Sequence, residues 1–203
     1  MGLGEEGIQQ AREAFEILGQ HGDTRGQARC LVTLAFSLLQ VKQLDAAEEA
    51  VTRAMDLYKN HDQHRLSQCH QILGRIQKSR GDREKAIHHL EASLRIISSV
   101  DLRYESSETH LALAILYIEE GKLDDAHAHL EHVESLAGDD MLSLGYAFFH
   151  GARVLLERKG FEEGKSGALR ALAIFEEIGA TRAAELAGRY IRAIEQLDRV
   201  RRL

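Results

Sequence analysis

The sequence predicts an all-α fold, an α-solenoid of antiparallel helix pairs with about nine helices. The 203-residue chain contains no proline, and only 5% of its residues are aromatic. It is rich in Ala, Leu, Glu, Gln and Arg, which lose little conformational entropy in a helix. Similar residue patterns also return every 38 to 40 residues along the whole chain, which is typical of stacked helical units.

A small residue marks the second helix of every predicted pair. Each copy is followed by apolar residues at helical spacing. The five copies are Gly7, Ala47, Ala86, Ala126 and Gly164. Because a small side chain lets two helices approach closely, these positions are expected to lie where helices cross.

A second marker, Leu followed by Ala or Gly, identifies the first helix of a pair. Its copies are Leu34-Ala35, Leu73-Gly74 and Leu113-Ala114. Gly81 and Gly121 follow these helices, and glycine is favoured at the left-handed end of a helix. In the fourth copy the marker is Gly151, thirteen residues before Gly164, which predicts one inserted residue.

The repeat organises residues 1–203 as a single solenoid. Residues 4–20 are predicted to form the second helix of an incomplete N-terminal pair. Four pairs follow, at residues 24–60, 61–100, 101–137 and, with the inserted residue, 138–180. Residues 181–203 form a closing helix or the start of a further pair. Neither helix of a pair can bury its apolar stripe alone, so the pairs must stack.

Two copies resemble the tetratricopeptide repeat, whose pattern combines a Leu-Gly pair, an aromatic residue and small residues. The matching residues are Leu73-Gly74, Gly81 and Ala86 in one copy, and Ala114, Tyr117, Gly121 and Ala126 in the next. The resemblance covers nearly the whole chain and implies a right-handed superhelix. The chain departs from the pattern in its period near 39 residues and in having Leu31, His70 and His110 where the family places tryptophan.

The longer period is similar to that of kinesin light chains and of signalling ATPases with repeat tails. The segments 43–50, 84–91 and 124–131 resemble the repeat tails of nucleotide-binding switch ATPases of the STAND class, fungal ones in particular. This resemblance implies a sensor or scaffold region of a larger cytosolic signalling protein. The sequence contains no G-x-x-x-x-G-K-[ST] phosphate loop, so an isolated adaptor is equally compatible.

Charge and hydropathy exclude several classes of partner. The formal net charge of −6 argues against nucleic acid, which requires a concentrated basic surface. No apolar run approaches the roughly 20 residues that span a bilayer, so no membrane contact is expected. The N-terminal residues also lack a basic and apolar export signal. We therefore expect a cytoplasmic protein.

The search for catalytic chemistry finds no enzyme motif, cofactor site or metal site. His127, His129 and His132 share one predicted helix, but their spacing does not bring all three to one face as zinc ligands require. His70 and His110 are expected to pack in the seam between helices. The sequence lacks a G-x-S-x-G elbow, a C-x-x-C pair and a glycine-rich dinucleotide loop.

The expected working surface is a groove lined by the first helices of successive pairs. Counting from the markers, its residues are Arg29, Val32, Phe36, Leu39, Gln40, Gln68, Gln71, Arg75, Lys78, Glu108, Leu111, Ile115, Ile118, Glu119, Phe148, Ala152 and Leu155. This predicted groove is apolar with a polar and basic centre. Its expected occupant is a peptide or amphipathic helix from a protein partner.

Two alternatives remain open at this point. Superhelical curvature could instead bury Val32, Leu111 and Phe148 between adjacent first helices. A solenoid without end caps would also expose apolar residues such as Phe15 and Leu18. The chain would then form homo-oligomers through its ends or its groove. An enzyme or a metal-binding protein is the third class.

Overall fold

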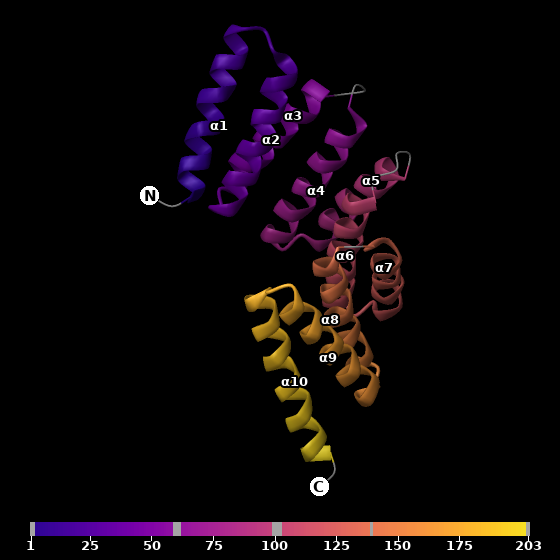
Figure 1. Ribbon diagram of the computed structural model, residues 1–203. Coiled ribbons are helices and arrows are strands. Elements are labelled where there is room, and N and C mark those ends of the chain that lie inside the picture. The colour runs from indigo at the N-terminus through magenta and orange to yellow at the C-terminus, as the bar shows by residue number, and fades with distance from the viewer. Residues whose placement is uncertain (1–2, 59–61, 99–102, 139, 202–203) are drawn as a thin grey trace. The chain divides into compact units, whose positions relative to one another are not determined.

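The computed structural model describes residues 3–58, 62–98, 103–138 and 140–201, which form ten α-helices and no strand (Figure 1). The all-α prediction is confirmed, with ten helices in place of about nine. The chain divides into two compact units, Met1–Asp101 and Leu102–Leu203. Each unit is described by itself. None of the helices in the described ranges has the length and apolar content of a membrane-spanning segment.

Unit 1 is a row of five helices in which each helix packs on the next. They are α1 (Leu3–Gln20), α2 (Thr24–Gln40), α3 (Leu44–Tyr58), α4 (Gln63–Arg80) and α5 (Arg83–Ile97). One core cluster spans α1 to α4 and is built from small and branched residues such as Ala35, Ala47, Val51 and Ile76. Each helix buries its apolar residues against its neighbours, which no single helix could do alone. This burial holds the row together.

Unit 2 repeats the arrangement. Its helices are α6 (Arg103–Glu119), α7 (Leu123–Leu136), α8 (Met141–Glu157), α9 (Phe161–Glu177) and α10 (Thr181–Arg201). Again each helix packs on the next, and α6 also contacts α8. Leu130 and Val133 occupy the core of α6 to α8, and Phe175 occupies the core that joins α8, α9 and α10.

Short turns fix where each helix begins. The carboxylates of Asp23, Asp62, Asp82 and Asp140 each accept a hydrogen bond from the backbone N–H three residues later. They therefore cap α2, α4, α5 and α8, and each cap satisfies a backbone N–H that has no partner within the helix. Gly81 ends α4 with a φ of 85°, in the left-handed region where glycine carries no steric penalty.

Close helix crossings explain the repeated small residues. A Cβ atom on Gly74 would lie only 2.9 Å from Leu90 Cγ and 3.3 Å from the carbonyl oxygen of Ala86. A Cβ atom on Gly164 would lie 3.1 Å from the carbonyl oxygen of Ala152. Larger side chains at these crossings would force the paired helices apart.

The same contacts correct the predicted insertion in the fourth copy. Ala152 lies against Gly164 as Gly74 lies against Ala86, and both pairs are separated by twelve residues. Ala152 rather than Gly151 is therefore the marker, and no residue is inserted. A Cβ atom on Gly151 would meet nothing within 4 Å, so Gly151 is not a crossing residue. The division into one continuous solenoid stays a prediction.

Arginines join successive helix pairs within each unit. Near the end of α4, Arg80 forms ion pairs with Asp45 and Glu48 of α3. Arg158, directly after α8, pairs in the same way with Asp124 of α7. Because Asp45 and Asp124 are fully exposed, the pairs that they form add little to stability.

Candidate functional site

Predicted groove residues of α2 and α4 meet on one surface of unit 1. The guanidinium carbon of Arg75 lies 5.4 Å from the ring centroid of Phe36, within cation–π range. Phe36 keeps 40% of its surface exposed. Arg29 and Gln40 follow helical spacing from Phe36 on α2, as Lys78 does from Arg75 on α4, and all three are exposed. We call these five residues the Phe36–Arg75 surface.

The remaining predicted residues of unit 1 are less accessible. Gln68 and Gln71 are half-buried, and the amide oxygen of Gln68 accepts a hydrogen bond from Arg65 at 2.8 Å. Val32 is half-buried and packs against the core cluster. Leu39 was assigned wrongly, because its side chain is buried in that cluster.

In unit 2, four of the five predicted α6 residues reach the surface at least in part. Glu108 and Glu119 are exposed, whereas Leu111 and Ile115 are half-buried. Leu111 also packs against the core of α6 to α8. Ile118 is buried in the same core, so its assignment to the groove was wrong.

The predicted residues of α8 lie in a different place from those of α6. Phe148, Ala152 and Leu155 line a cavity of about 470 Å³ that α8 forms with α7 and α9. Ala152 is buried at the crossing with α9, so the groove assignment of this residue was wrong. The cause is the one-residue error in register described above.

With the corrected register, Phe149 and Arg153 of α8 take the positions equivalent to Gln71 and Arg75. Phe149 is buried. Its ring centroid lies 5.3 Å from that of Tyr190 in α10. This helix surface is therefore covered by α10, and it offers little room to a partner.

Histidine pairs occupy the seams of two helix pairs. Nδ1 of His70 in α4 lies 3.3 Å from Nδ1 of His89 in α5. In the next pair, Nδ1 of His110 lies 2.7 Å from Nδ1 of His129, and the His132 ring stacks on His110 at 4.7 Å between centroids. In each pair one nitrogen donates and the other accepts, so at least one ring is neutral.

Burial and the neighbouring imidazoles lower the pKa of His70 to about 4, and the same two causes lower the pKa of His110 to about 4. Both rings are therefore neutral packing groups near pH 7. Within the described ranges, no group of three or more side chains has the arrangement of a metal site.

The helix α10 presents an apolar surface that the sequence analysis missed. Leu197 and Val200 are 57% and 70% exposed, and Leu186 is exposed on the same helix. With Tyr190 and Ala193 they follow a spacing of four and three residues, which places them on one stripe. That spacing was visible in the sequence.

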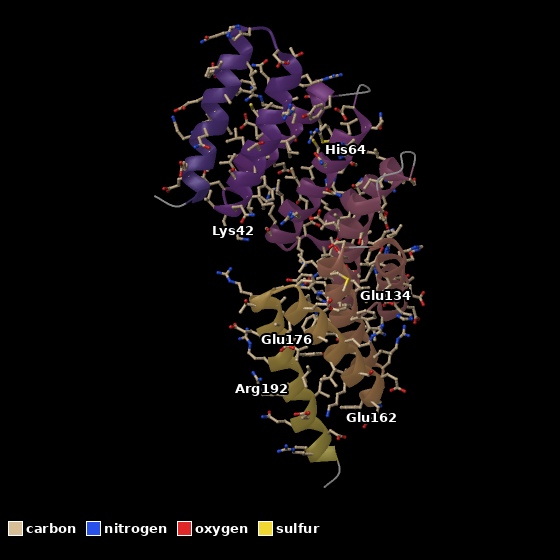
Figure 2. All side chains as sticks on the ribbon, viewed as in Figure 1. Lys42, His64, Glu134, Glu162, Glu176 and Arg192 are labelled. Atoms are coloured by element: carbon tan, nitrogen blue, oxygen red, sulfur yellow. The ribbon has the colours of Figure 1, made fainter. Side chains whose placement is uncertain are left out.

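Charged residues line a hollow beside α10, and the two N-terminal residues expected to be exposed are partly covered. Glu176 of α9 and Arg192 of α10, both labelled in Figure 2, line a hollow between these helices together with Arg189. At the other end, Phe15 and Leu18 are half-buried rather than exposed. Phe15 packs against the core of unit 1 and lies under the Arg53 guanidinium at 5.4 Å.

The paired helices, their period and the small residues at their crossings define an α-helical repeat fold that resembles the tetratricopeptide repeat. No protein-family model matches the sequence. No curated protein matches it either.

Solved structures share this fold at low sequence identity. BtubC (BKLC) from P. vanneervenii is 15% identical with a TM-score of 0.71, and the match covers 98% of this chain and 93% of that one. Aspartyl phosphate phosphatase F from Bacillus subtilis is 16% identical with a TM-score of 0.82, covering 91% and 52%.

A third structure, a putative kinesin light chain from Podosopora anserina with nearly identical TPR-like repeats, is 18% identical with a TM-score of 0.57. That match covers 82% of this chain and 94% of the other. The likeness to all three proteins is one of fold.

Proposed function

We propose that this chain is a non-catalytic protein-interaction module that binds a peptide or helix at the Phe36–Arg75 surface. The observation that carries the proposal is the exposed aromatic ring of Phe36 beneath the Arg75 guanidinium. Aromatic and arginine side chains dominate the binding energy of many protein interfaces. Arg29 and Lys78 add positive charge, so the fitting segment carries an apolar anchor and acidic or amide groups.

Structures of the same fold support this class of function. One neighbour, at a TM-score of 0.68, is a Rap protein complexed with Competence and Sporulation Factor, and another, at 0.60, is the APC/C hetero-tetramer Cut9-Hcn1. A cytoplasmic sensor or scaffold within a larger signalling protein fits the resemblance to STAND ATPase repeat tails. In unit 2, the predicted groove residues Glu108, Leu111, Ile115 and Glu119 of α6 are proposed separately as a second contact surface for a protein partner.

Charge and polarity changes at the Phe36–Arg75 surface should weaken partner binding. Peptides selected from a random displayed library on the immobilised protein provide the ligand, and fluorescence anisotropy gives its Kd. We expect Phe36→Asp and Arg75→Glu each to raise this Kd by about tenfold or more, since each removes an interface contact of about 1.4 kcal/mol.

Leu57→Asp is the matched control, because Leu57 is 41% exposed on α3 and lies outside the surface. Helical circular dichroism should be unchanged in all three variants. The assignment is wrong if every selected peptide binds the Phe36 and Arg75 variants as tightly as the original protein, or if Leu57→Asp weakens binding equally.

A self-assembly module is the second candidate, favoured by the exposed stripe of Leu186, Leu197 and Val200 on α10. Exposed apolar surface of this kind commonly marks a contact site. Self-assembly predicts a molar mass by light scattering that rises with protein concentration and becomes constant in Leu197→Glu. A monomeric mass at all concentrations in the unmodified protein would rule this candidate out.

A further inference from the structure

Two cavities occupy equivalent places in units 1 and 2. One cavity, of about 340 Å³, is formed by α1, α2 and α3, and the other is the α7–α9 cavity of about 470 Å³. Seven lining residues of the first cavity have a counterpart among those of the second. Leu31, Ala50 and Arg53 line the first, whereas Phe148, Gly167 and Arg170 line the second. Each matched pair is separated by the same 117 residues, or three repeats.

One lining position of these cavities carries a different residue in the middle pairs. At the position of Ala50 and Gly167, helices α5 and α7 carry His89 and His129. These histidines reach His70 and His110, which stand at the position of Leu31 and Phe148. In the two middle pairs a histidine thus stands at the position that Ala50 and Gly167 occupy beside these cavities.

The α7–α9 cavity combines an apolar floor with an acidic mouth. Its floor includes Leu130, Phe148, Ala152 and Leu155. The Arg170 guanidinium carbon lies 3.8 Å from the centroid of the Phe148 ring and so covers part of this floor.

Three carboxylates stand around the opening: Glu134, Glu162 and Glu163. Figure 2 labels Glu134 on α7 and Glu162 on α9. Arg170 is the single arginine or lysine among the described residues that line this cavity, beside these three carboxylates. The counterpart in unit 1 is balanced, with Arg12 and Arg53 beside two glutamates.

We propose that the α7–α9 cavity binds one large apolar side chain flanked by positive charges, presented by a basic segment of a protein partner. The cavity volume falls within the roughly 300–1,000 Å³ typical of binding pockets. The carboxylates at its mouth attract lysine and arginine and repel acidic segments. This site lies outside the Phe36–Arg75 surface, so either site can fail without the other.

Three short peptides test the charge and the anchor separately: acetyl-Lys-Phe-Lys-amide, acetyl-Glu-Phe-Glu-amide and acetyl-Lys-Ala-Lys-amide. Binding is followed by NMR through the methyl shifts of Leu155 and Ala152. We expect the first peptide to bind about tenfold or more tightly than either of the others. Equal affinity for the acidic peptide, or for the peptide without phenylalanine, would overturn the proposal.

Gly167→His closes the cavity with the residue that the protein uses at the equivalent positions 89 and 129. It should lower the affinity for acetyl-Lys-Phe-Lys-amide by about tenfold or more. Ala50→His makes the same change in unit 1 and should leave this affinity unaltered. Unchanged binding by a folded Gly167→His variant contradicts the site.

A second variant keeps the proposal testable if Gly167→His does not fold. Glu134→Gln with Glu163→Gln removes two charges at the mouth without changing the shape of the cavity. The preference for the lysine peptide over the glutamate peptide should then fall by at least about threefold. A preference that survives in this variant would show that the carboxylates do not select the ligand.

Discussion

Replacing Gly145 with alanine should destabilise unit 2 by about 1–3 kcal/mol, the usual cost of overpacking a core. The new Cβ atom would lie 2.5 Å from Cε1 and 2.9 Å from Cδ1 of Phe175. Phe175 is fully buried, and its ring contacts Tyr146 at 5.1 Å between centroids. The ring therefore has no space into which it can move.

Gly151→Ala is the matched control on the same helix. A Cβ atom there would meet nothing within 4 Å, and alanine is favoured over glycine in a helix by about 0.8–1.0 kcal/mol. Urea unfolding should therefore show a lower midpoint for Gly145→Ala and a higher one for Gly151→Ala. The packing of α8 against α9 is described incorrectly if both variants shift the midpoint in the same direction.

Acidification should destabilise the protein through His70 and His110. Burial and the adjacent His89, His88 and Arg95 lower the pKa of His70 to about 4. Burial, His129 and His132 act likewise on His110. An unfolded histidine binds its proton near pH 6.5, but the folded rings bind theirs only near pH 4. The unfolded chain therefore takes up more protons between these values, and stability falls as the pH decreases.

The expected loss is about 1–2 kcal/mol for each histidine, after allowance for the partial exposure of both rings. Urea unfolding at pH about 7.5 and about 5 measures it. His110→Phe should remove part of the pH dependence, since Phe148 already occupies the equivalent position in α8. The exposed His21 supplies the control: His21→Phe should keep the full dependence. If His110→Phe also keeps the full pH dependence, His110 is not a source of the destabilisation in acid.

The sequence was sufficient for the helices because helix crossings require small residues at a fixed period. It was insufficient for the register of α8, where Gly151 and Ala152 are adjacent and both small. Only the contact between Ala152 and Gly164 distinguishes them. Without that contact, the buried Ala152 was assigned to the predicted groove.

Surface exposure was harder to predict than helix position. Leu39, Lys78 and Ile118 occupy equivalent positions, yet Lys78 is exposed whereas the two apolar side chains are buried. At the edge of a face, an apolar side chain folds toward the core and a lysine extends into water. The stripe on α10 was missed for a related reason, because its spacing is the same whether or not another helix covers it.

One repeated position carries histidine in two helix pairs and alanine or glycine in two others. A repeat protein can therefore differ from pair to pair at a position that all of its pairs share. Positions 50, 89, 129 and 167 are equivalent, and all four lie in the second helix of a pair. An exchange among histidine, alanine and glycine at this position therefore changes the side chain that faces a binding space while the backbone remains helical. A single substitution at this repeated position would thus change the lining of one cavity and leave the other pairs as they are.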